Sequence, residues 1–429
     1  MSPTFASLSI YNYRVYALGA IVSNVGTWMG RVAQDWLVLT ELTDHDSTAL
    51  GIVTGLQFAP VVLLAPLAGS FADRFDKRKL LALSQTSLAI TAALLAVLVL
   101  TDVAQLWHVY VLAGLQGVAT ALDNPTRQAF VSEMVPPDKL SNAVGLNSAS
   151  FNGARLVGPA IAGLLIAAVG TGFTLVINAF SFIAVLGALA MMHGAELTRP
   201  PRGKGRGGVR EGLAYVRQRS DIKLLLFVVF MLGTFGMNFQ ITIALMSTSI
   251  FGRGASEYGL LSSVMAIGSL AAALMSARRP KPRLRVLFTA LIGFTVFSAA
   301  AGLAPTFWFF GLMLIPTGLC ALTVVTTANA AVQLSVSPQM RGRVMALYMA
   351  IFLGGTPLGA PMIGWIGDAW GPRWTILVGS LAVGLAAVAA ILYVMRTDRL
   401  TVTLERHPWH LNVVSARQAA AGIHPEQVR

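Results

Sequence analysis

The sequence predicts an all-α membrane protein with twelve transmembrane helices, arranged as two related bundles of six. Three observations support this fold class. Of the 429 residues, 55% are hydrophobic and 11% are charged, whereas a soluble domain carries about 25% charged residues. The apolar residues fall into twelve runs of the length, roughly 20 residues, that a helix needs to cross the hydrocarbon core. A segment of the first half also recurs in the second.

The twelve runs follow one another along the chain. The segment before the first run has no basic region and no small-residue cleavage site, so we expect that run to be a retained helix and not a signal peptide. Gly and Pro occur within several runs, which membrane helices tolerate because neighbouring helices satisfy the freed backbone groups. The predicted spans are 14–40, 49–72, 80–101, 107–130, 141–169, 172–192, 223–250, 257–277, 286–303, 307–333, 343–367 and 373–395.

The two sets of six spans are related in sequence. With a shift of 201 residues, Val135–Gly163 aligns with Val336–Gly364, and eight of 29 positions are identical, including a loop proline and three glycines. Such a repeat predicts two bundles around a central path, which alternate access by rocking against each other. We therefore expect an N-terminal bundle over 1–192 and a C-terminal bundle over 223–396.

The basic residues predict the orientation of the chain. Of the 31 Lys and Arg, 26 lie in segments that we assign to the cytoplasm, and only Arg253 and Arg373 lie in the opposite loops. This bias predicts an inner-membrane protein with both termini in the cytoplasm. It also predicts a cytoplasmic linker over 193–222, amphipathic from Val209 to Val216, and a cytoplasmic tail over 397–429. The net charge of +13 then indicates contact with anionic lipid and no nucleic-acid partner.

The most specific motif is GSFADRFDKRK, which runs from Gly69 to Lys79 between the second and third spans. It resembles the loop signature of the major facilitator superfamily (MFS), G-x-x-x-D-[RK]-x-G-[RK]-[RK]. Asp76 stands where that family usually has Gly, which puts the turn geometry in question. The resemblance implies an MFS fold and a conformational latch at Asp73, because a carboxylate there can face a helix N-terminus or a cation of the other half. The matching residues are Gly69, Asp73, Arg74, Lys77 and Arg78.

A second motif, NGARLVGPAIAG, lies in the fifth span and resembles the Gly-Pro motif of drug/proton antiporters in this superfamily. Its small residues and proline allow close helix approach and a bend, so they either gate the path or simply pack. They are Gly153, Gly158, Pro159 and Gly163.

The segments AGLQGVATALDNPTRQAFVSEMVP and GTWMGRVAQDWLVL are similar to the branch that includes the enterobactin exporter and macrolide-type efflux proteins. Ala113 stands where many proton-coupled members have an arginine. The proton-relay role of that arginine in other family members is therefore not assigned to any residue of this chain.

Charged side chains inside a membrane are costly and are functional candidates by default. Arg31 and Asp35 are four residues apart in the first span, share one helix face and can pair. Arg155 in the fifth span is expected to join them in the cavity that the resemblance implies. Asp35 is then the proton-coupling candidate, and the open alternative is a structural ion pair that never titrates. Asp123 and Arg127 are expected to form a structural pair that flanks the latch. Asp123 is also a second candidate for proton coupling, after Asp35.

Uncharged polar and aromatic residues on the apolar spans are candidates for contact with a substrate. The alternative for each is a hydrogen bond between helices or ordinary packing. The candidates are Trp28, Gln57, Asn147, Phe151, Asn178, Asn238, Gln240, Asn329 and Gln333, with Phe58 and Met349 as further members of an apolar wall.

Several protein classes are excluded by what the sequence lacks. There is no phosphate-binding G-x-x-x-x-G-K-[ST] motif, the single Cys320 cannot form a cysteine-ligated site, and the six histidines lie in loops, at span ends or in the tail. We expect no enzyme, no metal and no cofactor. The predicted function is proton-driven export of a small amphipathic molecule such as a drug, siderophore or secondary metabolite, by a monomer. The alternatives are a proton-coupled importer of a nutrient or metabolite and a non-transporting membrane receptor.

Overall fold

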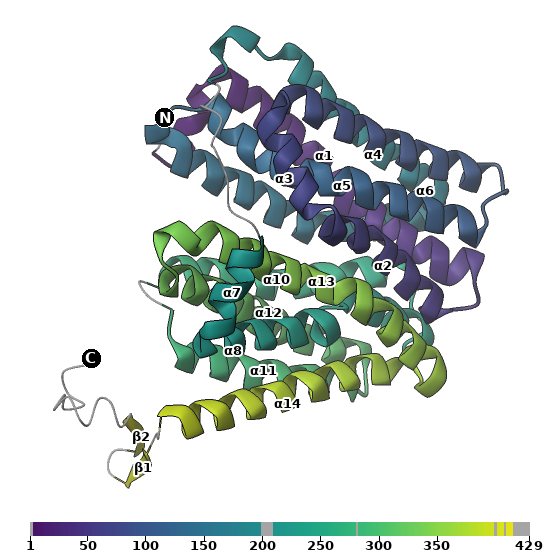
Figure 1. The fold of residues 1–429 in the computed structure, drawn as a ribbon. Helices are drawn as coiled ribbons and strands as arrows, with labels where there is room; N and C mark the ends of the chain where they lie inside the picture. Colours follow the sequence, from purple (N-terminus) through teal and green to yellow (C-terminus); the bar gives the residue numbers. More distant parts are fainter. Residues whose placement is uncertain (1–2, 199–208, 280–281, 399–400, 407–408, 415–429) are drawn as a thin grey trace.

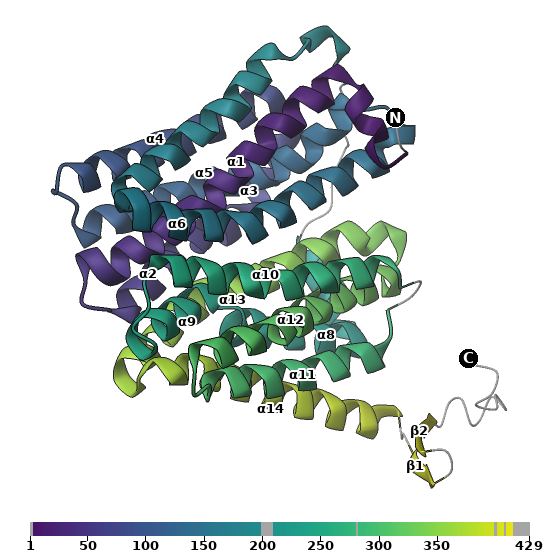
Figure 2. The same ribbon diagram turned by 180° about the vertical axis from the view of Figure 1, so that it is seen from behind.

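The computed structural model describes residues 3–198, 209–279, 282–398, 401–406 and 409–414. Figure 1 shows two groups of roughly parallel helices lying side by side, one coloured from purple through blue to teal and the other from teal through green to yellow. Figure 2 shows the same division from behind. The helices of each group run the length of the molecule, as segments that cross a membrane must.

The first group contains six spans. A short turn, η1, precedes α1, which continues as the π-helical segment η2. The second span is bent at Leu64, four residues after Pro60 and directly before the proline-containing first turn of α3, so that it is divided into α2 and α3. One long helix, α6, holds two spans that reverse at Gly170, whose φ of 84° is in the left-handed region that glycine adopts readily. The bounds are η1 Pro3–Ser9, α1 Tyr11–Trp36, η2 Leu37–Leu42, α2 Ser47–Leu63, α3 Ala65–Arg74, α4 Lys77–Leu100, α5 Leu106–Met134 and α6 Pro137–Met191.

The second group also contains six spans, of which the first is interrupted twice by π-helical turns. The short helices η3 and α7 lie in the connection between the groups, and a two-stranded antiparallel hairpin follows the last span. The bounds are η3 Gly194–Glu196, α7 Val209–Gln218, α8 Ser220–Met231, η4 Leu232–Gly236, α9 Phe239–Leu245, η5 Met246–Ile250, α10 Ala255–Ala277, α11 Leu284–Gly302, α12 Phe307–Ser335, α13 Pro338–Trp370, α14 Pro372–Asp398, β1 Thr401–Arg406 and β2 Trp409–Val414.

Most of these helices are apolar enough to cross a bilayer. Within the described residues, eight helical segments meet that criterion by length and composition, and α6 is one of them although it holds two spans. The other three spans are α1 with η2, α2 with α3, and α5. Two of these, α1 and α5, carry carboxylates and arginines, which lower their hydropathy. The predicted fold class of twelve helices in two bundles is therefore confirmed.

The internal repeat is visible in the helix contacts. A Cβ at Gly158 of α6 would lie 2.7 Å from Cβ of Trp28 in the first span, and the equivalent Gly359 of α13 lies against Thr234 in the seventh. A Cβ at Gly163 would lie 2.5 Å from the Ala255 carbonyl oxygen at the start of α10, and Gly364 meets the start of α2 in the same way. Equivalent glycines thus meet equivalent helices, which is the pseudo-symmetry that the shifted alignment predicts.

The two ends of the molecule differ. We call the end where α1 begins and α14 ends the basic end (Figures 1 and 2), because the Arg74–Lys79 turn and the connection between the groups also lie there. The opposite end is called the far end. Among the described residues, every hydrogen bond between the two groups joins α1 to α10 or α2 to α13 in the part of the molecule nearer the far end.

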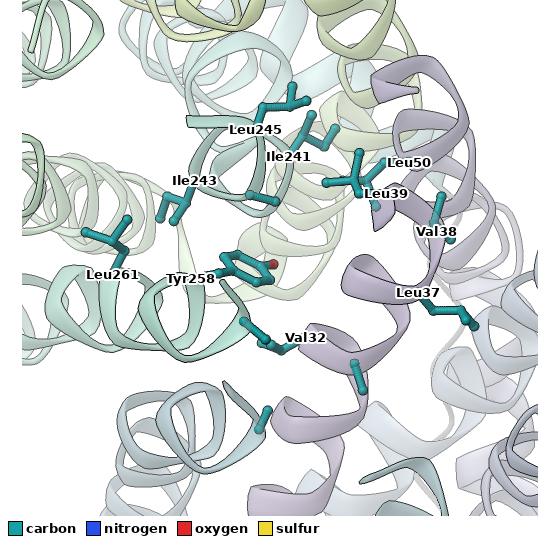
Figure 3. Packing of buried hydrophobic residues seen from close by; sticks show 14 of the residues in the cluster. Val32, Leu37, Val38, Leu39, Leu50, Ile241, Ile243, Leu245, Tyr258 and Leu261 are labelled. Atoms are coloured by element: carbon teal, nitrogen blue, oxygen red, sulfur yellow. The ribbon is translucent and has the colours of Figure 1, made fainter. Parts of the chain in front are cut away.

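A shared hydrophobic core closes the far end. Val32, Leu39 and Leu50 of the first group form one buried cluster with Ile241 and Tyr258 of the second. Figure 3 shows these side chains from both groups converging, with the ring of Tyr258 in the middle. Burial of apolar surface from both groups stabilises their contact at this end.

Candidate functional site

Asp35 lies close to the far end of α1, where the two groups meet. Its side chain is 3% exposed, and its Oδ2 accepts a hydrogen bond of 3.0 Å from the hydroxyl of Tyr258 in α10. Tyr258 is itself buried, within the apolar cluster that closes the far end. A hydroxyl can donate to a carboxylate and can accept from a carboxylic acid. The pair can therefore stay hydrogen-bonded in either protonation state of Asp35.

The salt bridge between Arg31 and Asp35 that the helix spacing allows is not formed. Among the described residues, no acidic oxygen lies within ion-pair distance of Arg31. The carbon of its guanidinium lies 5.0 Å from the centroid of the Trp28 ring and 5.6 Å from that of Phe58. In this conformation Asp35 faces α10 while Arg31 faces the aromatic rings, so the two charged groups are not in direct contact. Whether Asp35 carries a proton or serves only a structural role stays a prediction.

Arg155 joins Arg31 at the same indole ring. Its guanidinium carbon lies 5.5 Å from the Trp28 centroid, and the Phe151 ring meets Trp28 edge-on at 5.8 Å. We call these residues, with Phe58, the Trp28 cluster: Trp28, Arg31, Phe58, Phe151 and Arg155. The cluster joins α1, α2 and α6, which are the helices of the first group that contact the second. The structure thus brings the two arginines and the aromatic candidates together.

Asp123 has a different environment from Asp35. It is 5% exposed, and its Oδ1 accepts hydrogen bonds from Ser84 at 2.9 Å and Gln85 at 2.6 Å. Its Oδ2 forms an ion pair with Arg127 at 3.0 Å. Gln85 also accepts from Ser23 of α1. The carboxylate is satisfied on both oxygens and links α5 to α4, which is the structural environment expected for this pair.

The latch motif forms the turn between α3 and α4 at the basic end. The side chain of Asp73 lies outside the described residues, so the latch itself stays a prediction. A Cβ added at Gly69 would meet no atom within 4 Å, and Arg74 ends α3 with an exposed side chain. Asp76 accepts from the Lys79 amide at 3.1 Å and caps α4. The acidic residue that replaces the usual Gly therefore begins the next helix.

Two cations of the motif hold this turn to the same group of helices. Lys77 forms an ion pair of 2.6 Å with Glu133 at the end of α5, and both side chains are largely buried. Arg78 donates to the carbonyl of Ala190 at the end of α6. The sequence interpretation missed Glu133. The sequence feature that could have identified Glu133 is its position: it is an acidic residue at the end of a span, on the side of the membrane where the loops are basic.

The polar candidates lie on several helices of both bundles. Asn178 is 6% exposed and lies against Gly30 of α1, and Asn238 is 4% exposed and donates to the carbonyl of Thr234. Both amides are buried, and the side-chain oxygen of each has no hydrogen-bond partner within the described residues. Contact of these two residues with a substrate stays a prediction. Gln57, Asn147 and Gln240 are half-buried, and Gln333 donates to Asn329 at 2.7 Å within α12.

The Gly-Pro motif of α6 packs against two helices, α1 and α10. Gly158 meets α1, while a Cβ at Gly259 of α10 would lie 2.3 Å from the carbonyl of Pro159 and 3.1 Å from Gly163. Gly153 has nothing within 4 Å of its Cβ position. Three of the four motif residues therefore lie where backbones approach closely, and Gly153 lies at an open position.

Comparison with known proteins places this geometry in a family. Residues 2–420 match the family model of transmembrane secretion effectors, which belongs to the MFS type of transporter. The chain belongs to this family. It is therefore a multi-pass membrane transporter and not an enzyme.

Individual relatives agree with this membership. The chain is 27% identical over 353 residues to the staphyloferrin A transporter of Staphylococcus aureus, covering 81% of this chain and 87% of the relative. It is 26% identical over 387 residues to the multidrug efflux pump Tap of Mycolicibacterium fortuitum, covering 87% and 93%. A solved bacterial homologue of the lysosomal transporter Spinster shares the fold, with a TM-score of 0.70, 17% identity, and coverage of 91% and 97%.

The described residues lack an evident set of metal ligands. They contain no group of three or more His, Cys, Asp or Glu side chains that could hold a metal ion. Charged groups at or beside the interface between the two bundles include Asp35, Asp368 and the two arginines of the Trp28 cluster.

Proposed function

We propose that this transporter exports a small amphipathic organic molecule from the cytoplasm in exchange for protons, and that Asp35 carries the proton. The observation that supports the proposal most is the Asp35–Tyr258 hydrogen bond, because it joins a buried carboxylate of one bundle to the other bundle. The names of the relatives, a siderophore transporter and a drug efflux pump, support a small organic substrate.

The orientation follows from the charges. With the positive-inside bias, the basic end and both termini are cytoplasmic, and the far end faces outward. The structure is then closed toward the outside by the core around Tyr258 and by the contacts of α2 with α13. Rocking the bundles apart at the far end separates α1 from α10 and exposes Asp35 to external water.

Asp35 can link proton movement to this motion. An isolated ionised carboxylate is costly in an apolar environment, so closing the far end on Asp35 favours the protonated form or a conformation with a compensating cation. Substrate bound near the arginines and a proton bound on Asp35 can then favour different conformations, which is what exchange requires. No second subunit is needed for this cycle, and we propose that a monomer performs it.

The test uses everted membrane vesicles with an acidic interior, so that the pH gradient drives protons outward, and a dye that reports the internal pH. Erythromycin, ethidium and staphyloferrin A are added in turn to the wild-type protein, and at least one is expected to release protons from the vesicles. The Asp35→Asn variant should lose this response while the protein stays folded. The Asp102→Asn variant is the matched control, since Asp102 lies in the exposed turn after α4. Proton-coupled movement in the import direction, or an unchanged response in Asp35→Asn, would contradict the proposal.

A further inference from the structure

Two cations share one indole ring, and neither forms an ion pair with an acidic side chain of the described residues. The guanidinium carbons of Arg31 and Arg155 lie 5.0 Å and 5.5 Å from the Trp28 centroid. Both side chains are half-buried, and among the described residues neither takes part in an ion pair or a hydrogen bond. Like charges so placed repel each other and remain partly desolvated. The nearest acid along the helix, Asp35, is bonded to Tyr258 instead.

The neighbouring polar group is also a donor. The indole Nε1 of Trp28 is buried and has no hydrogen-bond partner within the described part of the chain. Guanidinium and indole groups donate hydrogen bonds and accept none. The cluster therefore presents a surplus of donors and positive charge, which a ligand with acceptor oxygens and negative charge would satisfy.

The rest of the cluster is aromatic and accessible. Phe151 is 49% exposed and meets the Trp28 ring edge-on, and Phe58 lies under Arg31 from the side of α2. Flat apolar surfaces beside fixed cations are suited to a planar ring that carries an acidic group. The cluster also lies on the three helices that contact the other bundle, so its occupancy can respond to the motion of the bundles.

We propose that the Trp28 cluster is an anion-binding subsite that takes the carboxylate of an aromatic or otherwise planar organic acid. The carboxylate oxygens accept hydrogen bonds from Arg31 and Arg155, and the ring of the ligand packs on Trp28 and Phe151. This inference rests on the proposed transport function and names its substrate class, an organic anion. Arg31 is one helical turn from Asp35, so the anion and the proton bind on adjacent turns of α1.

Binding of a matched pair of ligands tests the subsite without any pH gradient. Radiolabelled 1-naphthoate and 1-naphthylmethylamine are dialysed to equilibrium against the full-length protein in phosphatidylcholine nanodiscs. We expect the acid to bind at least about tenfold more tightly than the amine, since a charge-assisted hydrogen bond corresponds to a factor of that size. No binding of the acid by the wild-type protein, or equal binding of acid and amine, overturns the subsite.

Variants then locate the binding. Arg31→Gln and Arg155→Gln should each weaken naphthoate binding about tenfold, and Arg155→Lys, which keeps the charge, should weaken it less. Arg253→Gln is the matched control, because the Arg253 guanidinium also lies over an aromatic ring, 5.5 Å from Phe307, but outside the cluster. An equal loss in Arg253→Gln, or unchanged binding in both cluster variants, overturns the assignment. If a glutamine variant does not fold, Arg155→Lys and the acid-to-amine ratio of the wild-type protein decide.

Two further arms separate the alternatives. Nanodiscs containing phosphatidylglycerol test whether a lipid headgroup occupies the subsite; loss of naphthoate binding there would overturn the assignment to a soluble acid. The Asp35→Asn variant should still bind naphthoate. If naphthoate does not bind but the pH-driven response of the vesicles persists, only the subsite is wrong. If naphthoate binding follows the arginines but Asp35→Asn keeps its response, only the proton assignment is wrong.

Discussion

At the residue scale, two buried carboxylates in this protein have opposite environments. Asp123 accepts hydrogen bonds from Ser84, Gln85 and Arg127 within one bundle, so its charge is compensated. Asp35 accepts its hydrogen bond from the hydroxyl of Tyr258, which belongs to the other bundle. A fully compensated carboxylate stabilises a structure, whereas one whose partner moves away during the transport cycle can change its protonation with the conformation.

This contrast predicts that the role of Asp123 is to stabilise the folded protein. Replacing Asp123 by Ala leaves Arg127 buried without its partner, which should lower the free energy of unfolding by about 3–5 kcal/mol. The measurement is thermal unfolding in detergent, with Glu196→Ala as the control, because Glu196 pairs with His193 at an exposed position. A melting temperature equal to that of the wild-type protein would show that the Asp123 network is not structural.

At the element scale, the contacts of α2 with α13 close the far end. Asp368, near the end of α13, accepts hydrogen bonds from the backbone amides and hydroxyls of Ser47 and Thr48 at the start of α2. A carboxylate at a helix N-terminus is favoured by the unpaired amides and the helix dipole. Opening the far end must break this cap, because it joins the two bundles.

Asp368→Ala should therefore shift the population toward conformations that are open at the far end. Losing charge-assisted bonds worth about 1.5–3 kcal/mol each changes such an equilibrium by tenfold or more. Spin labels at Asp44 and Arg253, on far-end loops of different bundles, measure the distance distribution in wild-type and variant protein. Asp102→Asn is the control, because Asp102 lies at an exposed far-end turn and asparagine tolerates its positive φ of 57°. A distribution unchanged by Asp368→Ala would remove this cap from the closing of the far end.

At the scale of the whole molecule, the distribution of charge and the repeat act together. Basic residues gather at the end where α1 begins and α14 ends, while the far end is closed by apolar side chains of both bundles (Figure 3). Equivalent glycines of α6 and α13 bring equivalent helices into contact. Two related bundles held together chiefly at one end form an arrangement that can rock about their shared interface.

The proposed orientation, with the basic end in the cytoplasm, predicts the outcome of a topology experiment. A fluorescent protein that matures only in the cytoplasm, fused after the tail, should fluoresce, and alkaline phosphatase at the same position should be inactive. The same reporters inserted at Arg253 in the far-end loop should give the reverse pattern, since positive-inside bias places that loop outside. An active phosphatase after the tail would reverse the assignment of both ends.

The sequence by itself determined the twelve spans, the repeat and the identity of the intramembrane charges, because lipid requires long apolar helices and penalises each unneeded charge. It also selected Asp35, Trp28, Phe151 and Arg155 as candidates. Tertiary structure decided their partners. Tyr258 contacts Asp35 across 223 positions of the chain, whereas the sequence spacing offered Arg31 as one possible partner. Helix periodicity specifies which residues share a face, but the packing of one bundle on the other specifies what that face meets.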